Sequence, residues 1–148
     1  MHPSTRTQQW IELAANLTRA EFVRRHTGYF LISSPIAVTR EVRWIRKRVG
    51  TPSAEARVTV GRATACDLPL VHPSIANRHA AFSLSADGRP IAVSDLGSQT
   101  GTRVNGKPIP TLVRIPLDAG DRLQLGEVSA TIVDAEEAYE LLVAMAPS

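Results

Sequence analysis

The sequence predicts a mainly β protein, an antiparallel β-sandwich with helical ends. Short runs rich in β-branched and aromatic residues, separated by turn residues, fill the middle of the chain. A hairpin signal, Asn105-Gly106, joins two of these runs. Apolar residues at helical spacing mark the two ends of the chain instead. We therefore expect an N-terminal helical extension over residues 1–28, the sandwich over residues 29–133, and a C-terminal helix and tail over residues 134–148.

The N-terminal extension is expected to hold two helices. An apolar stripe at helical spacing runs from Trp10 to Leu17, and it predicts core anchors rather than a cofactor site. A second helix is expected to begin at Thr18, which forms a threonine-x-x-glutamate capping box with Glu21. Gly28 provides a residue at which this helix can end.

The predicted C-terminal helix begins at Asp134, a favourable N-cap residue. Glu136 and Glu137 lie in its first turn, where negative charge is favourable, and apolar residues between Ala138 and Met145 share one face. We expect this short helix to pack on the sandwich. An exposed apolar stripe that recruits a partner is the alternative.

The predicted strands are, in order, YFLIS, VRWIRKRV, RVTVGR, HAAFSLS, IAVSD, TRVN, TLVRI, RLQLG and SATIV. Residues 40–49 also fit a helix, with Thr39 as its cap and Gly50 and Pro52 beyond its end. Because the β-rich pattern resumes at once, we prefer a strand here, paired with residues 57–62 across the GTPSAEA loop.

The composition bounds the class of protein. A chain of 148 residues, 43% of them hydrophobic, is long enough to form a domain with a continuous core. Its single cysteine, Cys66, excludes an intramolecular disulfide and favours a reducing compartment. No uninterrupted apolar segment approaches the roughly 20 residues of a membrane span, and no basic stretch leads into an apolar one at the N-terminus. We expect a cytoplasmic protein without a membrane partner.

The net charge of +3 is unevenly distributed. Residues 40–48 hold five basic residues and one acid, so this segment carries a charge of +4 and the rest of the chain −1. Runs of charge usually keep a surface solvated, and we expect a solvated strand face here. Nucleic-acid binding by these arginines is the less favoured alternative.

Several catalytic patterns fail on specific residues. The segment GTRVNGK approaches a phosphate-binding Walker loop, but Pro108 replaces the hydroxyl residue that would hold magnesium, and the next segment predicts a strand rather than a helix. Cys66, Asp67, His72 and His79 supply metal-binding atoms at a spacing that matches no compact zinc site. No nucleophile elbow is present. We expect no enzymatic activity, no metal and no cofactor.

Four segments between Arg57 and Val133 resemble, in the same order, the forkhead-associated (FHA) domain: VTVGRATACDLPL, HPSIANRHAAF, SDLGSQTGTRVNG and LDAGDRLQLG. The resemblance implies a twisted antiparallel β-sandwich, recognisable over residues 57–133, whose loops at one end bind a phosphothreonine-containing protein. It implies no catalysis and no cofactor. Loops on a rigid sandwich can converge, and an arginine fork with short donors and backbone N–H groups suits a phosphate dianion.

The resemblance also implies roles for individual residues. Arg62, which follows Gly61 at a strand end, matches the family arginine that faces the phosphate, and His79 matches the histidine that braces the binding loops. Asn77 and Arg78 fall in the recognition loop, where shaping the turn alone is the alternative to contacting the peptide. The candidate phosphopeptide-binding residues are Arg62, Ser74, Asn77, Arg78, Ser98, Gln99 and Thr100, with Gly61, His79, Gly97 and Gly101 as structural support.

Three positions depart from the family pattern. Ala76 stands where a serine usually bonds the phosphate, and Ser74, two residues earlier, is the candidate substitute for it. Thr100 stands where an asparagine usually holds the peptide backbone, and Gln99 alters the neighbouring position. Loss of one donor to phosphate weakens binding by about tenfold to a hundredfold. A degenerate domain that binds an unmodified partner, or that assembles through its helical ends, is therefore the alternative function.

Overall fold

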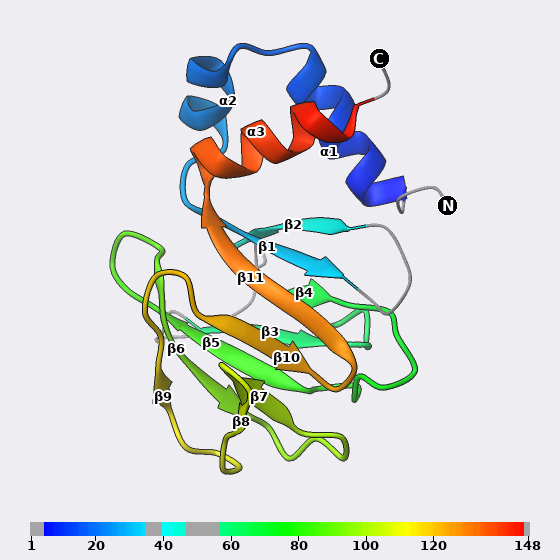
Figure 1. Cartoon of the computed structure of the whole chain (residues 1–148), viewed down its shortest axis with the longest axis vertical. Helices are drawn as coiled ribbons and strands as arrows, with labels where there is room; N and C mark the ends of the chain where they lie inside the picture. Colours follow the sequence, from blue (N-terminus) through cyan, green and yellow to red (C-terminus); the bar gives the residue numbers. More distant parts are fainter. Residues whose placement is uncertain (1–4, 35–39, 47–56, 147–148) are drawn as a thin grey trace.

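The computed structural model describes residues 5–34, 40–46 and 57–146. Their strands form two sheets that face each other, and the helices form a further layer against one of these sheets (Figure 1). The mainly β sandwich with helical ends that the sequence predicts is confirmed. No helix within the described residues is long and apolar enough to cross a membrane.

The larger sheet runs across the molecule next to the helices, and its neighbouring strands are antiparallel. In spatial order its described strands are β2 (Glu41–Ile45), β1 (Tyr29–Ser34), β11 (Val128–Asp134), β10 (Arg122–Leu125), β7 (Thr102–Val104) and β8 (Lys107–Pro108).

The smaller sheet forms the opposite layer and contains one parallel pair, β3 with β4, among antiparallel neighbours. In spatial order its described strands are β4 (Leu68–Pro69), β3 (Arg57–Gly61), β5 (Ala80–Leu84), β6 (Pro90–Asp95) and β9 (Ile115–Pro116).

The predicted pairing of residues 40–49 with residues 57–62 is wrong. Residues 41–45 do form a strand, β2, but it pairs with β1, and residues 47–56 lie outside the described part of the chain. The reason is burial on both faces: β2 places Val42 among the residues under the helices and Ile45 in the core between the sheets. A strand of this kind belongs in the sheet that carries the helical layer.

The predicted strand TLVRI is also wrong for most of its length. Only its last residue, Ile115, belongs to β9, and Thr111 forms an isolated bridge to Asp95. Pro110 cannot donate a ladder hydrogen bond, and Leu112 has a φ of 63°, in the left-handed region that strands do not use. This segment crosses the edge of the sandwich as a loop.

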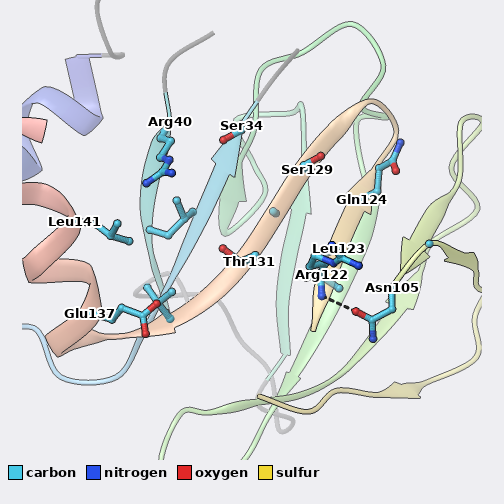
Figure 2. A pocket seen from close by; sticks show the side chains of 14 residues that line it. Ser34, Arg40, Asn105, Arg122, Leu123, Gln124, Ser129, Thr131, Glu137 and Leu141 are labelled. Atoms are coloured by element: carbon cyan, nitrogen blue, oxygen red, sulfur yellow. Dashed lines mark hydrogen bonds between the residues drawn. The ribbon is translucent and has the colours of Figure 1, made fainter. Parts of the chain in front are cut away.

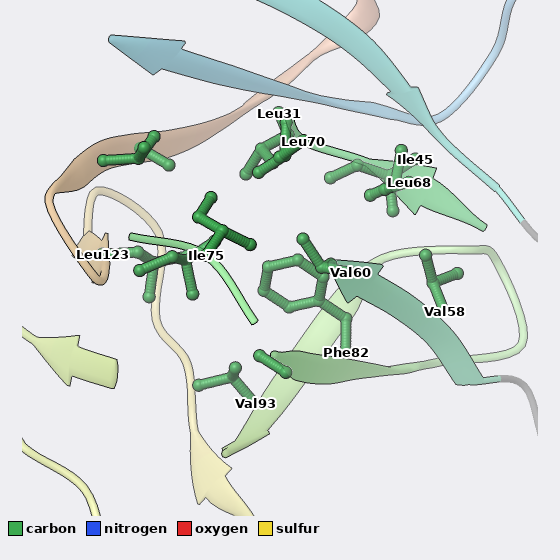
Figure 3. Packing of buried hydrophobic residues seen from close by; sticks show 14 of the residues in the cluster. Leu31, Ile45, Val58, Val60, Leu68, Leu70, Ile75, Phe82, Val93 and Leu123 are labelled. Atoms are coloured by element: carbon green, nitrogen blue, oxygen red, sulfur yellow. The ribbon is translucent and has the colours of Figure 1, made fainter. Parts of the chain in front are cut away.

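The main core lies between the two sheets. Leu31 and Leu123 from the larger sheet meet Val58, Phe82 and Val93 from the smaller one (Figure 3). The inward residues alternate with outward ones along each strand, which is the pattern that a sandwich requires. Each fully buried apolar side chain of this size stabilises the fold by about 1.5–3 kcal/mol.

A second core lies between the larger sheet and the helices. Phe22 and Phe30 are fully buried in it, and Trp10 packs edge-on against Phe30 with ring centroids 5.3 Å apart. Ala138 and Leu142 are buried there as well, so the C-terminal helix packs on the sandwich as expected. The helices are α1 (Thr5–Ala15), α2 (Arg19–Arg25) and α3 (Ala135–Met145), and both α1 and α2 contact α3.

The local signals for helix starts and turns are confirmed. Thr18 and Glu21 form both hydrogen bonds of the capping box at the start of α2. Asp134 accepts a hydrogen bond from the Glu137 backbone N–H at 2.9 Å. The hairpin between β7 and β8 has the left-handed φ values of a two-residue turn, 52° at Asn105 and 84° at Gly106.

The described part of the basic segment, residues 40–46, is solvated only in part: Arg40 and Arg46 are exposed, as expected, whereas Arg43 is not. The side chain of Arg43 is only 11% exposed, and it donates a hydrogen bond to Thr7 Oγ1 at 3.0 Å. Arg46 lies over the Trp44 ring, 4.1 Å from its centroid. Lys47 and Arg48 lie outside the described residues, so the structure places only three of the five basic residues of this segment.

Candidate functional site

Three loops meet at one end of the sandwich: residues 62–67 after β3, residues 70–79 before β5, and residues 96–101 between β6 and β7. The first two are joined by backbone hydrogen bonds from Arg62 N to Ala76 O, 2.9 Å, and from Ala63 N to Asn77 O, 3.2 Å. These bonds hold Arg62 beside the loop that carries Ser74, Asn77 and Arg78.

Gly61 is needed for this close approach. A Cβ atom at residue 61 would lie 2.2 Å from the carbonyl oxygen of Asn77 and 2.9 Å from Cys66 Sγ. The backbone oxygen cannot move without breaking the loop contact, so a side chain at this position is excluded on steric grounds. The glycine thereby fixes the backbone from which Arg62 projects.

His79 ties the second loop to the third. Its ring is fully buried; Nδ1 accepts a hydrogen bond from Ala76 N at 3.1 Å, and Nε2 donates one to the Gly101 carbonyl at 2.9 Å. This pair of partners assigns the neutral tautomer with its proton on Nε2. The side chain is wholly engaged inside the protein, so it cannot contact a ligand directly.

Asp95 organises the third loop, and we did not predict it from the sequence. Burial acts to raise the pKa of Asp95, but its hydrogen bonds together outweigh burial, so the pKa lies below its ordinary value and the carboxylate is charged. An aspartate followed closely by a Gly-Ser pair is a recognisable turn signal. The carboxylate accepts hydrogen bonds from Gly97 N at 3.0 Å, Ser98 N at 3.1 Å, Ser98 Oγ at 2.5 Å and Thr102 Oγ1 at 2.8 Å.

Two of the predicted binding residues are joined to each other. The Thr100 hydroxyl donates a hydrogen bond to the Ser74 carbonyl at 2.6 Å. The Ser74 hydroxyl accepts one from Glu127 N and lies 2.9 Å from His72 Nδ1. Both side chains, like Ser98 in the third loop, therefore stabilise the arrangement of the loops.

Gly126 lies beneath this Thr100 to Ser74 contact. A Cβ atom at residue 126 would lie 2.6 Å from the Ser74 carbonyl oxygen and 2.9 Å from Thr100 Oγ1. We did not predict this role, because a glycine after a strand carries no local signal that distinguishes a close approach from an ordinary turn.

The remaining predicted residues face solvent. Arg62, Asn77, Arg78 and Gln99 are all exposed, and their side chains make no hydrogen bond within the part of the chain that the structure describes. Gln99 lies between Gly97 and Gly101 at the tip of its loop. Two guanidinium groups and two amides are thus placed on neighbouring loops, where they can bind an anion and a peptide backbone.

Cys66 lies under the same loops but is not a reactive thiol. Burial is the largest influence on it and raises the pKa of the thiol above its ordinary value, although the positive charge of Arg78 acts in the opposite direction. Its Sγ donates a hydrogen bond to the Asn77 carbonyl at 3.1 Å. A protonated, buried thiol is a poor nucleophile and a poor metal ligand.

A second concave surface lies away from these loops, on the outer face of the larger sheet. It is a groove of about 580 Å³ between α3 and the β7–β8 hairpin. Figure 2 shows Arg40, Leu141 and Glu137 along its helical side and Gln124 and Asn105 on the opposite side. Hydroxyl side chains form its floor: Ser34, Ser129 and Thr131.

Comparisons with known proteins give a match to one family model over part of the chain, and a shared fold. Residues 58–126 match the family model of the FHA domain. The FHA domain of the CT664 protein from Chlamydia trachomatis is 24% identical, with a TM-score of 0.54 over 72% of this chain and 96% of that one. No significant match was found among curated protein sequences.

Two further solved structures resemble the chain at similar levels. The N-terminal FHA domain of Rad53p from S. cerevisiae, in complex with a phosphothreonine peptide, is 20% identical, with a TM-score of 0.55 over 76% of this chain and 98% of that one. The FhaA FHA domain, complexed with the intracellular domain of Rv3910, is 19% identical, with a TM-score of 0.51 over 71% of this chain and 99% of that one. At these identities the likeness establishes the shared sandwich fold.

Proposed function

The chain carries an FHA domain over residues 58–126, and from this premise we propose that it is a non-catalytic interaction module that binds phosphothreonine-containing segments of a partner protein. The phosphothreonine peptide bound to the Rad53p domain of S. cerevisiae supports this class of ligand. The site is the set of loops at the end of the sandwich where β3 leads into Arg62.

The main support for the proposal is the position of Arg62, whose backbone is fixed and whose side chain is exposed. Its backbone is held against Ala76 O at 2.9 Å, and Gly61 permits that approach, while its guanidinium remains exposed. A planar guanidinium can donate two parallel hydrogen bonds to phosphate oxygens. In the proposed complex Arg62 binds the phosphoryl group, and Arg78 adds positive charge from the adjoining loop.

The peptide backbone next to the phosphothreonine requires donors and acceptors as well. We assign this role to the amides of Asn77 and Gln99, which are exposed on adjoining loops. Thr100 and Ser74 act indirectly, because their mutual hydrogen bond joins the two loops. With Ala76 in place of a hydroxyl donor, we expect affinity about tenfold to a hundredfold below that of a domain with a serine there.

A degenerate phosphothreonine peptide library titrated against the full chain tests this function. We expect saturable binding that disappears when threonine replaces phosphothreonine, and a loss of at least about tenfold in the Arg62→Ala variant. Arg24→Ala, which removes an exposed arginine from α2, is the matched control and should bind as the wild type does. Equal and negligible binding by the wild type and Arg62→Ala would refute the proposal.

The groove beside α3 favours a second candidate function, the binding of an unmodified partner. Its volume of about 580 Å³ and its hydroxyl floor suit an extended polar segment, and the phosphate-facing loops do not contribute to it. Under this alternative, Ser129→Arg, which fills the floor of the groove, abolishes binding of a natural partner, whereas Arg62→Ala does not. Loss of that binding after phosphatase treatment of the partner would exclude this alternative.

A further inference from the structure

Polar side chains cross the outer face of the larger sheet in a row at right angles to its strands. The strand register places Ser34 on β1 opposite Ser129 on β11, and Ser129 opposite Gln124 on β10. Gln124 in turn lies opposite Arg103 on β7. Directly opposite residues project from the same face of a sheet. Because Ile32, two residues before Ser34, lies in the core under the helices, this is the face that carries the helical layer.

Arginines stand at both ends of this row. Arg103 forms the end on β7, and Arg40, which directly precedes β2, lines the groove beside α3 together with Ser34 (Figure 2). Arg103 donates a hydrogen bond to the Gly106 carbonyl at 3.2 Å, which leaves its charge uncompensated. Both arginines are exposed, and neither salt bridge between described residues involves them. The polar row consists of Arg40, Ser34, Ser129, Gln124 and Arg103.

The polar row holds two positive charges and no negative one. Among the described residues that line the groove, Glu137 alone carries a carboxylate. It lies on α3, beyond the end of β11 at Asp134, which is about 17 Å along that strand from Ser129. Arg122, exposed and opposite Thr131 in the neighbouring row, adds a third positive charge to this face. The charge of the row therefore suits a negatively charged partner.

We propose that the polar row docks an extended acidic segment of a partner protein, with one carboxylate at each terminal arginine. This inference rests on the second candidate function, for which it names the chemistry of the partner. The guanidinium groups of Arg40 and Arg103 can donate paired hydrogen bonds to the carboxylates. The hydroxyl groups and the amide between them can bond the backbone of the segment, whose N–H and C=O groups are unpaired in an extended chain.

The dimensions of the polar row set the spacing of the carboxylates. From β7 to β2 there are four inter-strand spacings of about 4.8 Å each, or about 19 Å in all. An extended chain rises about 3.3 Å per residue, so it crosses the row in about six residues. Residues an even number apart in such a chain project to the same side. We therefore expect two acidic residues about six positions apart.

The groove suits a peptide better than a nucleic acid. None of its described lining residues is aromatic, so bases would find no ring on which to stack. Glu137 would repel a regular series of phosphates along the helical side of the groove. A peptide can instead place an uncharged residue beside this carboxylate.

The test uses the full chain with Arg62→Ala, which removes the loop site, at low ionic strength. It titrates a mixture of nine-residue unphosphorylated peptides with glutamate fixed at the second and eighth positions and uncharged residues elsewhere. A matched mixture carries glutamine at those two positions. We expect the backbone amide resonances of Ser34, Gln124 and Ser129 to shift and saturate, with higher affinity for the glutamate mixture.

Variants test the two ends of the polar row. Arg40→Ala and Arg103→Ala are each expected to weaken binding of the glutamate mixture by about threefold, and together by about tenfold, because exposed charge pairs are individually weak. Arg103→Lys keeps the charge and should lose less than Arg103→Ala. Arg24→Ala, which removes an exposed arginine from α2, is the matched control and should have no effect.

The outcomes separate this inference from the functions proposed above. Equal affinity for the glutamate and glutamine mixtures would overturn the acidic preference and leave the groove as a site for an unmodified segment. Shifts that do not saturate, or that the double arginine variant leaves unchanged, would overturn the docking of this segment. Neither result concerns the loop site, which the phosphothreonine library tests. Tighter binding of a nine-nucleotide oligothymidylate than of the glutamate mixture would overturn the inference in favour of a nucleic acid.

Discussion

Gly61 and Arg62 show how a single residue can position another. The glycine carries no functional group, yet the 2.2 Å between its would-be Cβ and the Asn77 oxygen means that any side chain would push the loops apart. Arg62 supplies the charge, but its direction depends on that contact. His79 also supports the site without contacting a ligand, because both of its ring nitrogens form hydrogen bonds with the loops rather than with solvent.

We predict that Gly61→Ala weakens both the fold and phosphopeptide binding. Relief of the clash with Asn77 requires a backbone shift, and overpacking of this kind costs about 1–3 kcal/mol. Urea unfolding measures the loss of stability, and the library titration measures the loss of affinity. Gly88→Ala is the control: its added Cβ meets nothing within 4 Å, so it strains a distant turn without touching the site. Unchanged affinity in Gly61→Ala would contradict the positioning role of this glycine.

Among the helices and strands, the attachment of α2 to the larger sheet depends on aromatic packing around its C-cap residue, His26. The imidazole lies between Trp10 and Trp44, with ring centroids 5.0 Å and 4.9 Å away, and its Nδ1 is buried without a hydrogen-bond partner among the described residues. Burial first, and then the charges of Arg46 and Arg25, lower the pKa of His26.

The direction of this pKa shift gives a pH dependence. Because the folded protein resists protonation of His26, the unfolded chain takes up the proton first as the pH falls below about 6.5, the ordinary histidine value. Stability from this residue is therefore present above that pH and is lost progressively below it. We predict that His26→Phe, which keeps the aromatic packing, flattens this loss in urea unfolding measured from neutral to mildly acidic pH. Parallel pH profiles for the two proteins would show that His26 does not contribute.

For the molecule as a whole, the helices and the sandwich share a core. Phe30 from β1 is fully buried against Phe22 from α2, and Leu142 from α3 is buried in the same cluster. We therefore propose that the expected divisions at residues 28 and 133 separate elements of one cooperative unit rather than independent parts.

The two tryptophans allow a direct measurement of this cooperativity. Trp10 and Trp44 lie in the interface between α1 and the larger sheet, with ring centroids 5.9 Å apart, so their fluorescence reports on the helical layer. Far-ultraviolet circular dichroism reports mostly on the secondary structure of the whole chain. We predict coincident thermal transitions by the two methods. A fluorescence transition at clearly lower temperature would mean that the helices detach first.

The residues that could be predicted from the sequence are those whose role depends on near neighbours in the chain. The capping box at Thr18 and the hairpin at Asn105-Gly106 involve hydrogen bonds within a few residues, so their patterns are visible locally. The short runs of β-branched and aromatic residues, separated by turn residues, likewise predicted the sandwich. Within the candidate site, the order of the four family-like segments identified Gly61 and Arg62 as site residues.

The tertiary structure decided what depends on residues far apart in the sequence. The Thr100 hydroxyl reaches the carbonyl of Ser74, 26 positions away, and Glu127 N reaches the Ser74 hydroxyl over 53 positions. The partner of β2 was likewise set by burial on both faces rather than by proximity along the chain. Local hydrogen bonds and periodicity determine the elements, because they act within one element. Packing between elements determines which side chains remain available to a ligand, because it places distant residues in contact.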